Sequence, residues 1–435
     1  MEWLTRPDRL LPGFQLESVT LFQGYSSTAL PLGFGRAPFA GSLPGYDLDF
    51  GGSATFGWRR AGPRTNSWVS YSLSYERYQR HPEWNTPQHD LSFGISRSLS
   101  RRWNMALDAN TSIHSFPQFF FDPPVLRPVS DPPTNFEDLT GEAAAGRFSN
   151  DELASILTGA PVVESVGRTE TNLSRSSVTT LSTSVSYSHS PRLSIDFSVG
   201  ASRYRFLSGR RDGDASGGRV FFPGGASASA GLGLSYRLSR QTSLGATFST
   251  SRSFSPVQDG YYTTEQVSLT RSFLERWSVT ASAGSGTVHG VGLERSTPSR
   301  SVRRGVTWVA STSLSYNGRG HSLAFAASRN VGDSFGLAAR TTISTAASWS
   351  WQKPGRHWML DANASRYHSS LVGFQNLTGW WGGLGFVRIL SPHTSTRVDY
   401  GYGNYSSQFT GIFGNFRRHR VQISLSWSPG PRGAR

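Results

Sequence analysis

The sequence contains no cysteine and only one lysine, Lys353. Without cysteine the chain can form neither a disulfide framework nor a thiolate metal site. Charged residues make up 16% of the 435 residues, whereas soluble globular chains average about 25%. The formal net charge is nevertheless +15 and is carried almost entirely by arginine. Serine, threonine and glycine, rather than charged side chains, therefore make this chain polar.

Clusters of basic residues are missing as well. The arginines occur singly or in pairs, such as 101–102 and 417–418, mostly beside expected turns. Nucleic-acid binding needs clustered positive charge or a recognition motif, and neither a basic helix nor a zinc-ligand spacing accompanies these arginines. We therefore expect no nucleic-acid partner.

No apolar run reaches 18 residues, which excludes a transmembrane helix of ordinary length. The first residues, MEWLTRPDRLLPGF, carry Glu2, Arg6, Asp8 and Arg9 where a secretory signal would need an unbroken apolar core. We therefore expect residues 1–13 to be an N-terminal segment without a signal peptide. If the protein is exported, we expect its true start to lie upstream of Met1.

Strict alternation of apolar and polar residues is the main positive signal. In residues 46–58 the even positions are mostly aromatic or aliphatic, and the odd positions are aspartate, glycine, serine and threonine. The same alternation recurs in 193–201, 230–238, 306–316 and 421–427. A period of two predicts β-strands with one apolar face. Several of these segments exceed the five or six residues usual for soluble strands and are long enough to cross a bilayer when tilted.

Short turns and longer connections alternate between the predicted strands. Turns such as 61–65, 190–192 and 317–320 separate segments whose other ends are joined by 26–44, 117–175 or 208–224. This asymmetry is typical of outer-membrane barrels. The sequence therefore predicts an all-β, antiparallel, up-and-down transmembrane β-barrel of about 18 strands (16–18) over 14–427. We expect residues 428–435 to form a C-terminal tail.

Ten aromatic residues fall close to the short turns and are predicted to lie on the apolar face. Tryptophan and tyrosine favour the level of the lipid headgroups, so we expect these residues to form a girdle at one membrane interface. They are Trp58, Trp68, Trp103, Tyr187, Tyr236, Trp277, Tyr316, Trp351, Trp358 and Trp427.

In its hairpin rhythm, aromatic girdle and final alternating strand, the chain resembles the porin-like outer-membrane β-barrel proteins of Gram-negative bacteria. The resemblance is to the class and rests on no subfamily motif. It implies an outer-membrane location, a lipid bilayer as surroundings, and recognition of the last strand by the barrel assembly machinery. Members of the class usually end on the terminal aromatic residue, whereas here SPGPRGAR follows Trp427.

Charged residues on the polar phase are the candidates for lining the pore. Two interpretations are open: a charged zone that filters solutes, or cross-strand Asp–Arg pairs that stiffen the wall. The pairs are favoured, because pairing neutralises the field. The candidates are Asp49, Asp108, Asp196, Arg237, Arg340, Asp361, Arg397 and Asp399.

The segment 117–175 is the one long stretch without alternation. It begins with FPQFFFDPP, and its three successive phenylalanines indicate packing against another part of the protein. A connection of this length is usually functional or disordered. It could fold inward and constrict the pore, or lie outside as a lid, and partial occupancy of the lumen is slightly favoured.

These features predict a channel for passive diffusion of small hydrophilic solutes, with a preference for anions if some luminal arginines are unpaired. The histidines are scattered, and none forms a catalytic set with a serine and an acid. We therefore expect no enzyme, no cofactor and no metal. Other interpretations remain open: the barrel of a plug-dependent, TonB-type receptor, a non-conducting structural or enzymatic outer-membrane barrel, or a soluble β-propeller.

Overall fold

The computed structural model describes residues 14–27, 46–80, 85–115, 125–127, 162–164, 175–208, 225–254, 259–274, 276–291, 302–334, 337–352, 357–371, 377–407 and 416–429. Nearly all of them lie in strands. The strands are β1 (Phe14–Ser26), β2 (Asp47–Ala61), β3 (Thr65–Tyr78), β4 (Thr86–Ser98), β5 (Trp103–Ser115), β6 (Val125–Arg127), β7 (Val162–Glu164), β8 (Arg175–Ser188), β9 (Leu193–Ser208), β10 (Gly225–Arg237), β11 (Thr242–Phe254), β12 (Asp259–Phe273), β13 (Trp277–Val291), β14 (Val302–Asn317), β15 (His321–Ser334), β16 (Leu337–Gln352), β17 (Trp358–Leu371), β18 (Leu377–Ile389), β19 (Thr394–Ser407) and β20 (Phe416–Trp427). Within these ranges, no helix is long and apolar enough to span a membrane.

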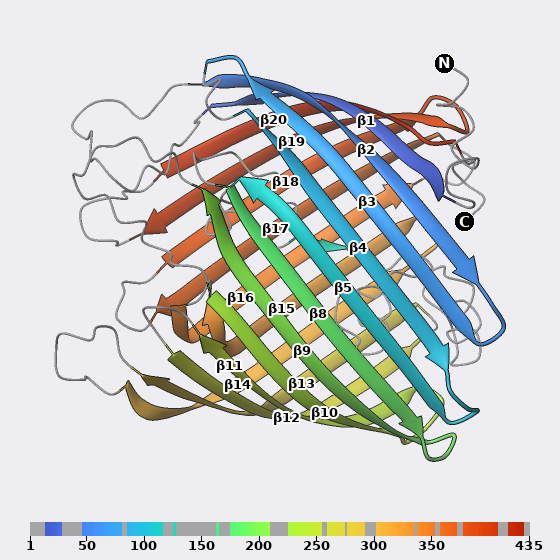
Figure 1. Cartoon of the computed structure of the whole chain (residues 1–435), viewed down its shortest axis with the longest axis vertical. Coiled ribbons are helices and arrows are strands. Elements are labelled where there is room, and N and C mark those ends of the chain that lie inside the picture. The colour runs from blue at the N-terminus through green and yellow to red at the C-terminus, as the bar shows by residue number, and fades with distance from the viewer. Residues whose placement is uncertain are drawn as a thin grey trace.

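Eighteen of the strands form one antiparallel sheet that closes on itself (Figure 1). Each strand pairs with the next along the chain, β5 pairs with β8, and β20 returns to β1. The closing pair contains eight residue pairs, from Val19 with Trp427 to Ser26 with Arg420. Every strand of the ring therefore has two neighbours, and the predicted barrel of about 18 antiparallel strands is confirmed.

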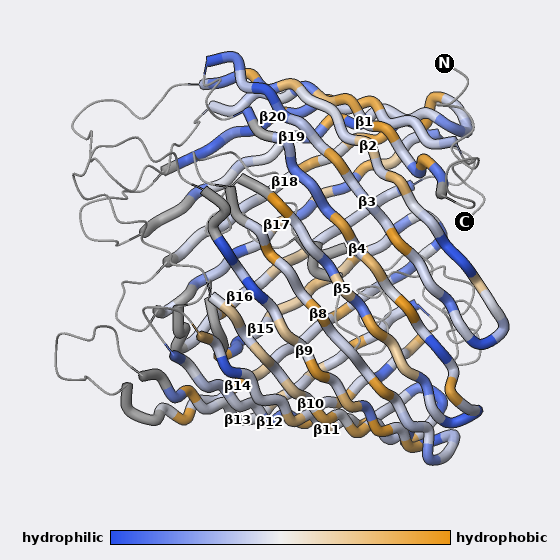
Figure 2. The backbone as a smooth tube through the Cα atoms, in the orientation of Figure 1, coloured by the Kyte–Doolittle hydropathy of each residue, from blue (hydrophilic) through white to orange (hydrophobic). Residues whose placement is uncertain are grey.

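The two faces of the sheet differ in polarity, because successive side chains of a strand point to opposite faces. Large apolar side chains cover the outer face, and Leu21, Val199 and Leu384 are 59%, 62% and 60% exposed there. The inner face carries many hydroxyl groups that bond across strands, as Ser282 does with Ser311 at 2.7 Å. Figure 2 shows this alternation of apolar and polar residues along the strands.

One end of the barrel carries the tight turns, the start of β1 and the end of β20. Backbone hydrogen bonds close these turns, for example from Gly62 to Thr65 at 2.8 Å. The opposite end, called here the long-loop end, carries the longer connections. Three connections at that end are brief, however: 255–258, 335–336 and 372–376. At these three places the expected alternation of short and long connections is wrong. Antiparallel neighbours can be joined by as few as two residues, so the barrel does not require long connections at either end.

Two pieces of the segment 117–175 are described, and they pair with each other as the strands β6 and β7. The segment leaves the wall after β5 and returns at β8, yet β6 lies beside β15, β16 and β17. In the ring these three strands lie opposite β5 and β8. The β6–β7 pair therefore reaches across the barrel to the far wall, as a loop folded into the lumen would.

Candidate functional site on the inner face of the barrel

Three charged side chains meet on the inner face of β17 and β19. The Nε of Arg397 donates to both carboxylate oxygens of Asp399, at 2.7 and 2.8 Å. Its Nη2 donates to Oδ2 of Asp361 at 2.9 Å. The three side chains remain partly exposed, at 34% for Arg397, 34% for Asp399 and 19% for Asp361. One guanidinium thus bridges two carboxylates at the surface of the lumen.

The strand between them, β18, has glycine at the crossing point. Gly385 pairs with Asp361 on one side and with Asp399 on the other. A Cβ at this position would lie 2.5 Å from Nη2 of Arg397 and 2.6 Å from each carboxylate oxygen of Asp361. Glycine therefore leaves the room in which the guanidinium crosses β18.

A second charged cluster lies toward the long-loop end, on β2, β3 and β20. Its members are Asp47, Asp49, Glu76, Arg418 and Arg420, and the first four are only 1–4% exposed. Nη2 of Arg420 lies 3.5 Å from Oε1 of Glu76 and 3.8 Å from Oδ2 of Asp49. Removing such charges from water costs several kcal/mol per ion unless they are paired. The cluster is thus buried in the structure, in contrast to the partly exposed group around Arg397.

Backbone and hydroxyl groups complete this cluster. Oδ1 of Asp47 accepts hydrogen bonds from the backbone N–H groups of Leu48, at 2.7 Å, and Arg80, at 3.0 Å. Nε of Arg418 donates to Oγ of Ser26 at 3.1 Å. The arginines of β20 therefore connect the closing strand to β1, β2 and β3.

Aromatic side chains of the inner face lie over glycines of neighbouring strands. A Cβ added at each of these glycines would meet the aromatic ring, so the missing side chain lets the ring lie close to the sheet. The lumen is therefore lined by flat aromatic surfaces as well as by charges. The pairs are Trp68 over Gly94, Trp381 over Gly401, Tyr367 over Gly379 and Phe22 over Gly51.

The position of Trp68 contradicts its assignment to the outer girdle. Its indole lies against Gly94 together with Asp108, on the face that also carries the buried Glu76. Residues of the alternate phase of β3, such as Tyr75 at 45%, are the exposed ones. Trp68 is followed by a second apolar residue, Val69, so alternation alone gave no unique phase here.

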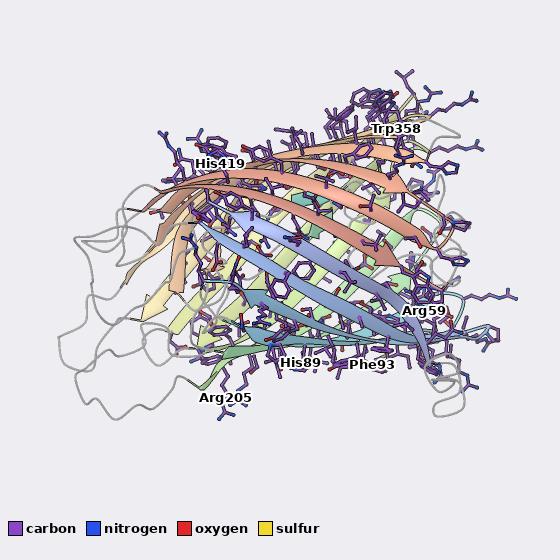
Figure 3. The ribbon with its side chains drawn as sticks, turned by 90° about the horizontal axis from the view of Figure 1, so that it is seen from above. Arg59, His89, Phe93, Arg205, Trp358 and His419 are labelled. Carbon is purple, nitrogen blue, oxygen red and sulfur yellow. The ribbon has the colours of Figure 1, made fainter. Side chains whose placement is uncertain are left out.

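The other nine predicted girdle residues lie on the outer face near the tight turns, and several stack in pairs. Ring centroids are 4.6 Å apart for Trp103 and Tyr187 and 4.7 Å apart for Trp277 and Tyr316. Trp358 points away from the barrel at this end (Figure 3). The remaining members are Trp58, Tyr236, Trp351 and Trp427.

A second aromatic zone, which the sequence analysis missed, lies on the outer face toward the long-loop end. The hydroxyl of Tyr71 bonds to Nδ1 of His89, and that of Tyr400 to Nδ1 of His419, each at 2.9 Å. Figure 3 shows both histidines on the outside of the barrel. Both belong to the outward phase of their strands, so alternation could have revealed them.

Four of the eight predicted luminal residues enter the two clusters: Asp361, Arg397, Asp399 and Asp49. Asp108 lies beside Trp68, and a Cβ on Gly94 would be 2.8 Å from its Oδ1. Asp196 is exposed on the inner face of β9. Arg237 is exposed at the end of β10, beside a tight turn. Arg340 belongs to β16, but its side chain lies outside the described residues.

Glu76, Arg418 and Arg420 were not predicted as site residues. Arg418 was interpreted as half of the pair 417–418 beside a turn, near the start of the last strand. Their phase was informative, since Arg418 and Arg420 alternate with outward residues in the same way as Gln422 and Ser424 do. In the ranges that the structure describes, no three His, Cys, Asp or Glu side chains are grouped so that they could hold a metal ion.

No protein-family model and no curated protein matches the sequence. Among solved structures, the chain is similar to OccK2 (OpdF) of Pseudomonas aeruginosa, with 10% identity and a TM-score of 0.45 over 95% of this chain and 98% of that one. It is also similar to the outer membrane protein OpdK of Pseudomonas aeruginosa, with 11% identity and a TM-score of 0.42 over 95% and 99%. The geometry of the chain itself is that of a closed antiparallel barrel of eighteen strands, apolar outside and charged within.

Proposed function

We propose that this protein is an outer-membrane channel through which small hydrophilic solutes diffuse passively. The observation that carries the proposal is the closed ring of eighteen strands with an apolar outer face and a polar inner face. Rings of 16–18 strands enclose a space wide enough for an aqueous channel. Exposed apolar side chains over a whole outer face fit the acyl chains of a bilayer.

Two aromatic zones support the placement in a membrane. The girdle near the tight turns and the zone with His89 and His419 lie at the two levels where the bilayer would meet water. The partners of the chain are then the lipid bilayer and, during assembly, the machinery that recognises the last strand, Val421–Trp427. The tight turns face the periplasm in this arrangement.

The group of Asp361, Arg397 and Asp399 is the proposed lining that solutes meet, with Asp108, Asp196 and Trp381 as further wall residues. Anion preference would require luminal arginines without acidic partners. Arg397 contacts two carboxylates, and Arg420 lies between two more. Each cluster therefore contains one carboxylate more than it contains guanidinium groups. Outside the clusters, Asp108 and Asp196 outnumber Arg237 among the predicted luminal residues whose side chains are described, so we expect a weak preference for cations.

Conductance in planar bilayers tests the proposal. The full chain should give stepwise, persistent current, and the reversal potential across a potassium chloride gradient should have the sign of cation preference. Heat-modifiable migration on gels should first show that the barrel is folded. A folded barrel without current would overturn the channel and favour a non-conducting structural or receptor barrel. A reversal potential of the opposite sign would overturn only the charge preference.

A further inference from the structure

The hydrogen-bond ladder between β14 and β15 stops halfway along the strands. Ala310–Asn317 pairs with Ser322–Arg329 in eight residue pairs. Both strands continue toward the long-loop end, but among the described residues 302–309 and 330–334 do not pair with each other. They pair with β13 and β16 instead. We call this place, where the edge 302–309 faces the end 330–334, the seam.

At the seam the end of β15 lies on the inner side of its neighbours. Cγ1 of Val309 and Cγ2 of Val331 would each be 2.9 Å from a Cβ on Gly286 of β13. Tyr262, Val288, Val309 and Val331 form a buried apolar cluster there. Cα atoms of β12 and β13 come within 8 Å of Cα atoms of β15. In a smooth wall, adjacent strands are about 4.8 Å apart, so strands that are not adjacent would be farther from each other than this. Among the described residues, no strand pairs with this edge of β14 beyond Ala310.

Part of the seam lies at membrane depth. Val306 and Trp308 are 69% and 58% exposed on the outer face. Tilted strands gain about 2.5 Å of height per residue, so Val309 and Val306 lie about 17 and 25 Å above Tyr316 of the girdle. Val309 therefore lies inside an apolar band about 25 Å tall, and Val306 lies at its boundary, near the level of the second aromatic zone. Unpaired sheet edges are not tolerated in contact with lipid, so the part of the edge inside the band, 306–309, needs a cover.

The positively charged side chain of Arg329 lies at this edge. The guanidinium of Arg329 lies 3.9 Å from the centroid of the Trp308 ring. Its Nη2 donates to Oγ1 of Thr307 at 3.2 Å. Its Nε is buried and has no hydrogen-bond partner among the described residues. An ionisable group at membrane depth is costly unless a counter-charge accompanies it.

We infer that the seam is a binding groove for an anionic amphiphile. The carboxylate or phosphate head binds Arg329, and the hydrocarbon chain lies against Trp308 and the free edge of β14. A free fatty acid and a membrane phospholipid share this chemistry. The inference needs the barrel to be in a bilayer, but it does not depend on conduction through the lumen.

Photolabelling of the full chain in phosphatidylcholine vesicles tests the groove. Two probes are compared: a fatty acid and a phosphatidylglycerol, each with a diazirine in its acyl chain. Mass spectrometry then measures adducts on 302–309 relative to adducts on the peptide that contains Leu384, which is 60% exposed on the outer face of β18. The Leu384 adducts report contact with bulk lipid, and their absence would overturn the membrane placement itself.

We expect at least one probe to label the seam several-fold more than Leu384. Arg329→Gln should lower the seam-to-Leu384 ratio about tenfold, because one charge-assisted contact is lost, and Arg329→Lys should keep most of it. Arg203→Gln, an exposed outer-face control on β9, should leave the ratio unchanged. Labelling by the fatty acid alone identifies a free amphiphile, and labelling by the phosphatidylglycerol, with or without the fatty acid, identifies membrane lipid. A ratio near one, or one that Arg329→Gln does not change in a barrel with normal Leu384 adducts, would overturn the groove.

Discussion

Gly385 and Arg397 compete for one point of the inner wall, because a Cβ on Gly385 would lie 2.5 Å from Nη2 of Arg397. The glycine and the ion pairs therefore form one unit: Arg397 reaches Asp361 across β18 only while residue 385 has no side chain.

Replacing this glycine should separate the pairs. We expect Gly385→Ala to lower the free energy of unfolding by about 1–3 kcal/mol, because the added methyl displaces the guanidinium and leaves carboxylates without their donor. Urea unfolding in lipid vesicles measures it. Gly382→Ala on the same strand is the matched control, since the nearest atom to its Cβ is 3.8 Å away. Equal losses in both variants would contradict the steric argument.

The charge of Arg397 should set ion preference near the tight-turn end. Arg397→Gln removes the positive charge between Asp361 and Asp399, so the reversal potential should shift further toward cations. Asp399→Asn should shift it in the opposite direction. Both shifts should shrink in concentrated salt, because the group is partly exposed and is screened. Arg203→Gln, at an exposed position on the outer face of β9, should change the reversal potential little. Shifts of the same sign in Arg397→Gln and Asp399→Asn would refute the role of this group.

Arg420 should matter for stability. Its side chain is 12% exposed and faces Asp49 and Glu76, whose side chains alone are 1% and 5% exposed. Breaking a buried pair by removing one partner costs about 3–5 kcal/mol, so Arg420→Gln should lower the free energy of unfolding by that amount. Arg205→Gln, on the outer rim in Figure 3, should change it by less than about 0.5 kcal/mol. A small effect at Arg420 would mean that the cluster does not depend on this charge.

The facing of β10 can be tested at two adjacent residues. Leu234 is 43% exposed on the outer face, and Ser235 belongs to the inner face. Leu234 lies only two residues from Tyr236 of the girdle, so Leu234→Arg should cost about 1–2 kcal/mol, between the midplane and the interface values, whereas Ser235→Arg should be tolerated in a wet lumen. Folding yield into vesicles and urea midpoints report the difference. Similar behaviour of the two variants would exclude the assigned orientation.

Alternation predicted the barrel well, because side chains change face at every residue of a strand and each face of this sheet is either apolar or polar. The alternation in 421–427 predicted that Val421, Ile423, Leu425 and Trp427 share one face. All four side chains are on the outer face, where they are 38–55% exposed. Where two apolar residues are adjacent, as Trp68 and Val69 are, alternation does not show which of them faces outward. In the structure the indole of Trp68 faces inward.

The site was less accessible to prediction because its contacts cross strands. Asp361 and Asp399 are far apart in the chain, and only the pairing of β17, β18 and β19 brings both of them beside Gly385. The seam depends on irregular register, with shifts between Asn330 and Gly332 and between Val288 and Gly290. One-residue shifts of this kind leave no periodic trace in the sequence.

The hydrogen bond between Thr20 and Ser426 joins residues that are 406 positions apart. During synthesis β1 is made first, yet one of its two edges has no partner until the final strand exists. A growing or interrupted chain thus presents two unsatisfied edges, which could pair with other chains. Assembly of this protein is therefore expected to be completed late and in one step, when the last strand reaches the first.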